Sequence, residues 1–490
     1  MKLPVSLNVV LATAGLSWLS LPVAAQPAPG ASPAPPAAEQ PSANFEIYGT
    51  LVPLFELGRT TGATAAGTMG ASQVANFSGV NAPPRFVLDP ATSALGFRGG
   101  VDLIKDLAIV WQIESGVPVG GEPVANTIAS RNTNLGLSGP WGTLFVGNWD
   151  TPYKWSSNQI VNPVRAGVLP DNNTILHGPG FGVNPITTQP GRANASSDAA
   201  FYRRVGNTLQ YWTPSKSGFN ARLSYGANEG RTARVGAAPP LNPSIFGAFL
   251  SYDTGPFRVR YAYELHKDYF GMTPLGGSPV SNTNKKSLDQ GHEFIAQYTR
   301  AAPTGDTRIV GIFEYLTYTS EDSTMPAMGP VPAKAYARPA FYGLIQHAIG
   351  KHNLWGAFGM ALDGSCKLVT GACTTSGLGA NEVTLGYIYR FSRNTDIFAY
   401  AFRITNSKSG QYTSPNLQGV AAPGADAEAI GISIVHQFSV KLGGPVKATA
   451  PPAQPSQPEL KPPPPPPPPA PAEPPPATPP NPAEPKPPNP

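Results

Sequence analysis

The chain has little charge and, after its first 25 residues, no long apolar run. Charged residues make up 13% of its 490 residues, whereas the usual share is roughly a quarter. No later apolar stretch approaches the roughly 18 residues that a membrane-spanning helix needs. The second absence excludes a helical membrane protein. It leaves a secreted protein, or one that crosses a membrane with β-strands.

The patterns of nucleic-acid binding, metal binding and hydrolysis are also missing. The net charge of +5 is not gathered into a basic cluster, which phosphate binding needs. No G-x-S-x-G motif occurs, and no glycine-rich phosphate loop precedes a helix. Histidines without metal-site spacing are scattered at His177, His266, His292, His347, His352 and His436. We predict no nucleic acid, no metal, no cofactor and no enzymatic activity, and an outer-membrane hydrolase is the weaker interpretation.

Cysteine is almost absent. Cys366 and Cys373 are the two cysteines of the sequence, and they enclose the six residues KLVTGA. In an exported protein, such a pair is typical of a disulfide that closes a loop. A metal site is the alternative, but further Cys or His ligands are not close by in the sequence. The pair therefore predicts a disulfide.

Both ends of the chain differ in composition from the middle. Residues 1–25 combine Lys2, an apolar segment and the small-residue site Val23-Ala24-Ala25, which is typical of a secretory signal peptide. A membrane anchor is the alternative, and Pro22 with the small-residue site favours cleavage. Residues 26–44 form a Pro/Ala-rich leader and 439–490 a Pro-rich tail. Neither composition can form a core, so we expect both to be disordered around a folded part at 45–438.

Short segments with period-two alternation fill the folded part. In one of them, Phe257, Val259 and Tyr261 alternate with Arg258, Arg260 and Ala262. Such alternation indicates strands that each have one apolar face. The expected strands are 45–55, 93–99, 107–116, 134–138, 143–149, 207–214, 219–226, 244–252, 257–266, 292–299, 308–318, 338–349, 353–362, 382–391, 396–405 and 428–438.

The connections between these sixteen strands alternate in length. Short turns such as 253–256 are followed by long loops such as 267–290. Short turns on one side and long loops on the other are typical of outer-membrane barrels, and an even strand count places both ends together. A soluble β-sandwich is the alternative, but its loops would not sort by length. We predict an all-β, sixteen-stranded antiparallel transmembrane β-barrel whose tail lies in the periplasm.

Several phrases carry a family resemblance. They are LGFRGGVDL (95–103), QIESG (112–116), SRNTNLGLSGPWGTLFVGNWDTPYK (130–154) and the closing strand that ends in Phe438. Together they resemble Gram-negative general porins, most nearly the β-proteobacterial type. The resemblance implies a water-filled outer-membrane channel, usually a homotrimer surrounded by lipid and lipopolysaccharide, that passes small hydrophilic solutes and ions by diffusion. It also implies an inward-folded third loop and an assembly signal at Phe438, which here is internal rather than terminal.

Charges that line the lumen would set the selectivity of such a channel. By parity, the lumen is expected to carry Arg98, Arg222, Arg258, Arg260, Arg308, Arg390 and Arg403 against Glu114, Glu264, Glu293, Glu314 and Glu382. The resemblance places acidic residues in the inward loop, where Asp150, Asp171 and Asp198 stand, with Arg203 and Arg204 at its exit. At some wall positions the resemblance implies a basic residue, but this sequence has Thr50, Ala94 and Asn134 there. We predict weak anion preference or little selectivity.

The Pro-rich tail supports a second hypothesis. Polyproline can act as a spacer or as a ligand for a partner. The alternative function is therefore a structural outer-membrane barrel whose tail tethers it to peptidoglycan or to a periplasmic partner. A tail with no partner is equally consistent with the sequence.

Overall fold

The computed structural model describes most of the region expected to fold. The described residues are 43–64, 81–89, 91–119, 128–158, 163–164, 175–180, 200–227, 243–269, 287–303, 305–320, 333–368, 371–414 and 422–443. The chain divides into two compact units, Met1–Pro41 and Ser42–Pro490, and every described residue belongs to the second. The predicted signal peptide and nearly all of the predicted leader and tail lie outside the described residues.

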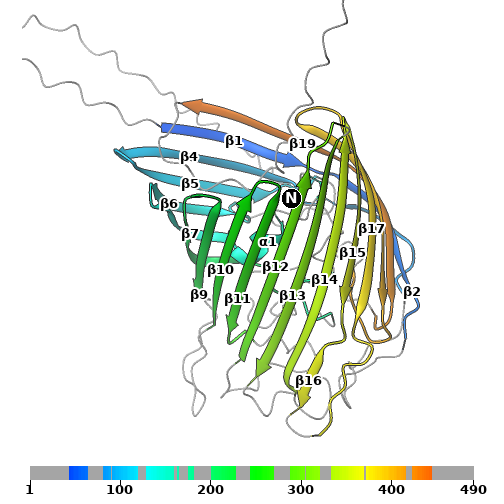
Figure 1. The fold of residues 1–490 in the computed structure, drawn as a ribbon. Coiled ribbons are helices and arrows are strands. Elements are labelled where there is room, and N and C mark those ends of the chain that lie inside the picture. The colour runs from blue at the N-terminus through cyan, green and yellow to red at the C-terminus, as the bar shows by residue number, and fades with distance from the viewer. Residues whose placement is uncertain are drawn as a thin grey trace, which may run out of the picture. The chain divides into compact units, whose positions relative to one another are not determined.

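The described residues form one antiparallel sheet and a short helix (Figure 1). Within them, no helix is long and apolar enough to cross a membrane. The helix is α1, Pro152–Asn158. The strands are β1 Ala43–Leu51, β2 Leu54–Thr61, β3 Arg85–Asp89, β4 Ala94–Ile104, β5 Leu107–Gly116, β6 Thr133–Gly139, β7 Gly142–Asp150, β8 Arg204–Trp212, β9 Phe219–Ala227, β10 Ser244–Thr254, β11 Phe257–Lys267, β12 Ser287–Arg300, β13 Asp306–Ser320, β14 Ala333–Ile349, β15 His352–Ala361, β16 Ser365–Leu368, β17 Ala380–Arg390, β18 Thr395–Asn406 and β19 Asp426–Gly443.

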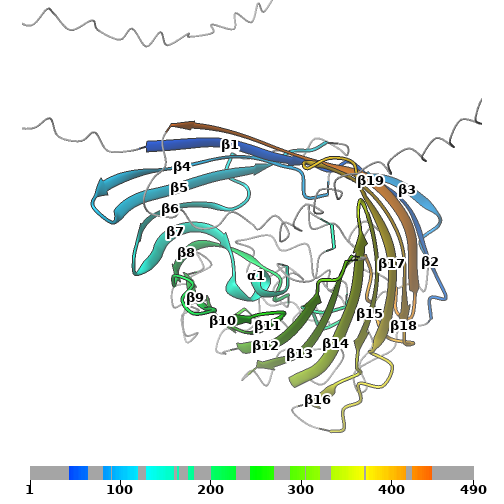
Figure 2. The same cartoon turned by 45° about the horizontal axis from the view of Figure 1, so that its top comes forward.

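These nineteen strand segments form sixteen barrel strands, because three of the barrel strands are interrupted. β1 and β2 both pair with β19, and β15 and β16 both pair with β14. β3 pairs with β2 and β4 with β1, so β3 and β4 are parts of the next strand. The sheet closes where β1 pairs with β19 (Figure 2). The predicted sixteen-stranded antiparallel barrel is confirmed.

The break between β1 and β2 has a chemical cause. Pro53 lacks a backbone N–H and cannot donate to a strand ladder. Instead, the Val52 backbone N–H donates to Ser93 Oγ at 2.8 Å, and Ser433 Oγ donates to the Pro53 carbonyl at 2.7 Å. Ser93 itself lies just before β4. Ser93, at the break in the second barrel strand, and Ser433 of β19 therefore satisfy the backbone groups that the first break leaves without strand partners.

The outer face is apolar, as a surface that meets lipid must be. On β11, Phe257 and Val259 are 52% and 54% exposed, whereas Arg260 is 6% exposed on the inner face. Neighbouring strands add a row of rings, in which Phe313 lies 6.4 Å from Phe294 and 5.1 Å from Phe341. The alternation predicted from the sequence therefore separates a lipid-facing from an inward-facing side.

One charged residue was assigned to the wrong face. Arg403 was predicted to line the lumen, but its neighbours in register across the sheet are the outward-facing Val383 and Glu428. Its side chain is 57% exposed and forms an ion pair with Asp426 at 3.0 Å. On β18, the inward residues are instead Phe398, Tyr400 and Phe402. The error arose because this strand places apolar residues on both faces, so polarity alone does not distinguish them.

The closing strand is longer than expected. β19 continues past Phe438 to Gly443, and its last residues pair with Ala43–Leu51 of β1. Phe438 is paired with Gly49, and a Cβ added to Gly49 would lie 2.4 Å from the Phe438 ring. The predicted strand end at 438 was therefore wrong by five residues, because the apolar alternation continues beyond Phe438 through Val440 and Leu442.

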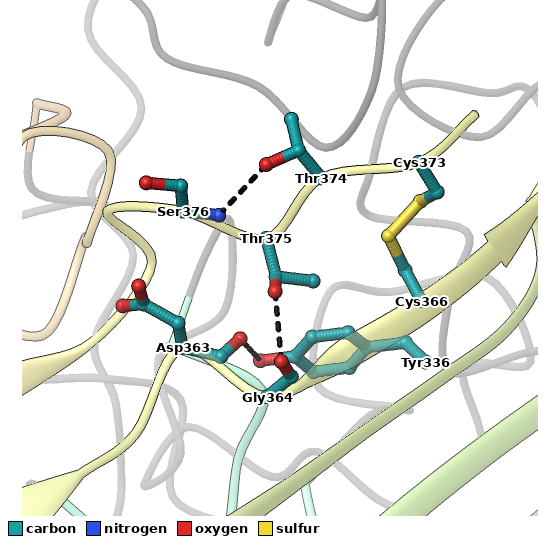
Figure 3. The surroundings of a disulfide bond; sticks show 8 residues. All are labelled: Tyr336, Asp363, Gly364, Cys366, Cys373, Thr374, Thr375 and Ser376. Carbon is teal, nitrogen blue, oxygen red and sulfur yellow. Dashed lines mark hydrogen bonds between the residues drawn. A yellow bond between two sulfur atoms is a disulfide. The ribbon is translucent and has the colours of Figure 1, made fainter.

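Cys366 and Cys373 form the predicted disulfide (Figure 3). It joins β16 to the loop before β17, and Thr375 Oγ1 of that loop donates to the Gly364 carbonyl at 2.8 Å. Replacing both cysteines with serine is expected to destabilise this loop by about 2.5 kcal/mol through chain entropy. Hydrogen exchange should show faster exchange at residues 371–379 and unchanged exchange in β5. Equal exchange at 371–379 would contradict the prediction.

Candidate functional site

The loop that follows β7, residues 151–203, is called loop 3 here. Its described parts, 151–158, 163–164, 175–180 and 200–203, pack against the inner face of the barrel. It begins with α1, and its helical start has local causes. Pro152 stands at the first helical position, where its missing N–H costs nothing. Thr151 precedes it, and its Oγ1 accepts a hydrogen bond from the Lys154 backbone N–H at 3.3 Å. The inward-folded third loop that the sequence predicted is confirmed (Figure 2).

Aromatic and arginine side chains hold α1 against the wall. The Arg222 guanidinium lies between the Trp155 and Trp212 rings, 3.2 Å and 3.7 Å from their centroids. Arg260 Nη1 donates to the Ser156 carbonyl at 2.7 Å. Arg222 on β9 and Arg260 on β11 therefore hold the start of loop 3 against the wall. Both were predicted to face the lumen, and both do so beneath α1.

Two buried glutamates of the wall bind the same loop. Glu314 accepts hydrogen bonds from the Tyr153 hydroxyl at 2.9 Å and from the His177 backbone N–H at 3.0 Å. Glu293 accepts from Ser156 Oγ and lies 3.3 Å from His177 Nε2. All of these side chains are fully buried or nearly so. The carboxylates of β12 and β13 thus serve as acceptors for loop donors.

Arg338 on β14 secures the second described part of loop 3, residues 175–180. Its Nε donates to the Gly178 carbonyl at 2.7 Å, and its Nη2 donates to the Ile175 carbonyl at 3.3 Å. Its Nη2 also lies 3.5 Å from Glu314 Oε2. Arg338 is 0% exposed. Arg338 was not among the predicted lumen residues, although it has the same parity as the inward-facing Ala340 and Tyr342.

Wall glycines provide space for loop side chains. A Cβ added to Gly291 would lie 2.8 Å from the Phe201 ring, and one added to Gly359 would lie 2.6 Å from Ile175 Cγ2. A Cβ on Gly247 would lie 2.8 Å from the ring of Pro152. Glycine in a strand often marks such a close approach. We call these three positions the glycine sockets, and they lie on β12, β15 and β10.

An apolar half of the inner wall completes the docking. Loop residues Val164, Ile175 and Leu176 belong to one buried cluster with side chains of the wall. The wall members are strand residues such as Val310, Ile312, Tyr342, Leu344, Trp355, Phe398 and Phe402. Burial of such side chains stabilises the loop by about 25 cal/mol per Å² removed from water. Loop 3 therefore has both polar and apolar anchors.

Asp150, predicted as a constriction acid, forms part of an ion-pair network at the start of loop 3. It lies 3.0 Å from Lys154 Nζ and 3.1 Å from Arg204 Nη2, and Asn132 Nδ2 donates to it at 3.0 Å. Burial lowers the pKa of Lys154 to about 8, although Asp150 opposes the shift. Asp171 and Asp198 lie outside the described residues.

Other predicted lumen charges are paired. Arg98 Nε lies 2.8 Å from Glu46, and Arg131 Nε lies 2.7 Å from Glu114. Arg258 pairs with Asp253 at 2.9 Å near a short turn. Arg203 lies over the Tyr269 ring at 4.8 Å. Glu46 and Arg131 were missed by the sequence analysis, although Glu46 lies in an alternating strand. The pore-lining role of the whole set remains a prediction.

The fold and the site together define a class of protein. A closed antiparallel barrel with an apolar outer face and an internal docked loop is an outer-membrane channel.

Comparison with known proteins agrees with this class. A family described as "Gram-negative porin" matches residues 12–409. The "Major outer membrane protein P.IA" of Neisseria meningitidis is 24% identical over 47% of this chain and 61% of its own length. The "Outer membrane porin protein 32" of Delftia acidovorans is 22% identical over 71% of this chain and 85% of its own length. The solved "Anion-selective porin from Comamonas acidovorans" has a TM-score of 0.54 at 16% identity and covers 81% of this chain and 100% of that one.

The family match covers most of the chain, so the chain belongs to the Gram-negative porin family. It is an outer-membrane channel protein for passive diffusion, and its predicted localisation in the outer membrane is confirmed.

Proposed function

We propose that the lumen beside loop 3 passes small hydrophilic solutes and ions without a covalent step. The observation that carries this proposal is that loop 3 is held against the inner wall of a closed barrel by hydrogen bonds and apolar contacts. A loop held in this way narrows the lumen on one side and fixes the shape of the lumen. Purified protein in a planar bilayer should give discrete conductance steps. A protein that inserts and gives no steps would refute the proposal in favour of a structural barrel.

The channel is proposed to prefer anions weakly. Glu46, Glu114, Asp150 and Glu314 each lie close to a cationic side chain, which neutralises them. The guanidinium of Arg222 is stacked on rings rather than paired with a carboxylate in the described residues. The similar porin of Comamonas acidovorans is described as anion-selective, which is consistent with this sign. Under a potassium chloride gradient, the reversal potential should have the anionic sign and be small, and clear cation preference would refute the proposal.

Lys154 is expected to make that preference depend on pH. Its pKa of about 8 means that the side chain is charged below this pH and neutral above it. The lumen therefore loses one positive charge as the pH rises, and anion preference should decrease between about pH 7 and pH 9. Lys154→Arg should remove this decrease in anion preference, because an arginine stays protonated over the whole pH range. An equal decrease in anion preference in Lys154→Arg would show that Lys154 is not the group that titrates.

We also propose a homotrimer that is surrounded by lipid and lipopolysaccharide. On the outer face across β19, β1, β4 and β5, aromatic rings lie over glycines, which favours a flat surface. The Phe438 ring covers Gly49, and a Cβ on Gly99 would lie 3.0 Å from the Trp111 ring. A flat apolar face is suited to contact with another subunit. Native mass spectrometry should show three copies, and a single copy at all concentrations would exclude the trimer.

A second candidate function rests on the tail. β19 ends, at Gly443, on the side of the short turns. We propose that the tail reaches peptidoglycan or a periplasmic partner from that side. Deletion of residues 451–490 should reduce co-sedimentation with peptidoglycan while conductance stays unchanged. Unchanged co-sedimentation would remove the tether and leave the channel proposal intact.

A further inference from the structure

A second loop also folds into the barrel, although nothing in the sequence analysis indicated it. The loop between β18 and β19, residues 407–425, is called loop 8 here and is described at 407–414 and 422–425. Ser409, Gln411, Thr413 and Ser414 are between 0% and 2% exposed, and Tyr412 is 4% exposed. Polar loop residues are normally solvated at the surface. Their burial here means that this segment is packed inside the protein.

Loop 8 contacts loop 3 directly. The Gln411 backbone N–H donates to the Gly180 carbonyl at 2.8 Å. A Cβ added to Gly180 would lie 2.0 Å from Cζ of Tyr412, so the ring lies flush against the loop 3 backbone. Tyr412 also belongs to the buried cluster that contains Ile175 and Leu176. Residues 175–180 are therefore held between β14 and loop 8.

Asn406 turns loop 8 inward. Its Nδ2 donates to the Tyr412 carbonyl at 2.8 Å and to the Ala425 carbonyl at 2.7 Å. Its Oδ1 accepts from the Tyr412 backbone N–H at 2.9 Å. One side chain thus satisfies both backbone groups of Tyr412 and joins the two ends of the loop. Asn406 is a positioning residue that acts through Tyr412.

Neighbouring loops support the same conformation. Ser407 and Ser409 donate their backbone N–H groups to the carbonyls of Gly379 and Gly377 at 2.9 Å and 2.8 Å. In the first loop, the Thr64 backbone N–H donates to the Pro423 carbonyl at 2.8 Å. With the bond from Gln411 to Gly180, the described part of loop 8 thus has hydrogen bonds to three neighbouring loops.

We infer that loop 8 is a second constriction element and that Tyr412 limits the size of the solutes that pass. The inference rests on the channel function. The Tyr412 ring packs against Gly180 of loop 3 and belongs to the same buried cluster as inward-facing wall residues. Loop 8 therefore adds its own bulk to that of loop 3 and reduces the cross-section available to a hydrated solute. Uncharged sugars of increasing size are the appropriate probes, because charge on the wall does not affect their passage.

The first test removes the ring and its positioning residue. Tyr412→Ala is expected to raise single-channel conductance about two-fold, because the narrowest cross-section limits flow, and to raise the size of sugar that enters proteoliposomes. Asn406→Ala should do the same, and the double variant should open no further than either single variant. Additive effects would show that Asn406 acts independently of Tyr412 and would overturn its role. Unchanged conductance and sugar size in Tyr412→Ala would overturn the constriction.

The second test uses the contact between the loops. Gly180→Ala places a Cβ against Tyr412 and should displace loop 8, which raises conductance. Gly371→Ala is the matched control, since Gly180 and Gly371 have φ of +80° and +85° but Gly371 has nothing within 4 Å of its added Cβ. Conductance that changes equally in both variants would attribute the effect to backbone strain and overturn the contact. A wild-type protein without conductance would instead refute the channel function itself.

Discussion

Arg338→Met is expected to free the second part of loop 3 from the wall and to raise single-channel conductance. The guanidinium supplies the hydrogen bonds to Gly178 and Ile175, and a thioether cannot replace them. With those bonds lost, residues 175–180 keep their apolar contacts and their bonds to Glu314 and loop 8. The loop should therefore fluctuate rather than leave the lumen. Current recordings should show a larger and noisier open level.

The same substitution should lower stability. Removing one partner of a buried ion pair leaves an uncompensated charge and typically costs about 3–5 kcal/mol. The remaining charge here is Glu314, which is fully buried. Thermal melting in detergent, followed by circular dichroism, measures the loss. Arg98→Met is the matched control, because it also removes a wall arginine that is paired with a glutamate. The contacts of Arg98 in the described residues are with Glu46 and Tyr48 of β1 rather than with loop 3.

A double variant separates the two consequences of losing Arg338. Arg338→Met with Glu314→Gln removes the unpaired charge, so part of the lost stability should return. The loop carbonyls remain without their donor, so the raised conductance should persist. If conductance returned to the wild-type level together with stability, the anchoring role of Arg338 would be wrong, and the channel change would come from the buried charge alone.

The barrel could be predicted because its causes are local in the sequence. Period-two alternation and loop lengths can be read along the sequence, and most of the strands from β1 to β19 follow that alternation. The prediction failed where a strand does not have one polar and one apolar face. On β18, the lumen side carries Phe398, Tyr400 and Phe402, so Arg403 was placed on the wrong face. An apolar inner wall is possible here because loop residues cover it.

The site was less predictable because its contacts join residues distant in sequence. Tyr153 and Glu314 are 161 residues apart, and Arg338 and Gly178 are 160 apart. A single sequence gives no signal for such pairs. It gave no signal for loop 8 either, because Ser409–Ser414 has the composition of an ordinary surface loop. Asn406, at the end of a strand, was the residue that determined the path of that loop.

Gly359→Val is expected to have the opposite effect from Arg338→Met and to lower conductance. The new Cβ would lie 2.6 Å from Ile175 Cγ2 and 3.3 Å from Ile175 Cβ, so the loop itself must move. Ile175 is β-branched and cannot rotate its side chain away cheaply. The wall is a hydrogen-bonded sheet, so the softer partner, loop 3, should shift toward the lumen. Overpacking of this kind typically costs about 1–3 kcal/mol.

Gly311→Val is the matched control for the glycine sockets. Gly311 lies on the outward face of β13, and a Cβ there would meet nothing within 4 Å. Valine favours a strand more than glycine does, so this control should fold with unchanged conductance. Ile175→Ala in the Gly359→Val background removes the colliding atoms and should restore conductance. If the double variant stayed as narrow as Gly359→Val, the wall rather than loop 3 would have moved. Gly359→Val should therefore lower conductance and Arg338→Met should raise it. These opposite changes in conductance are expected only if loop 3 sets the width of the channel.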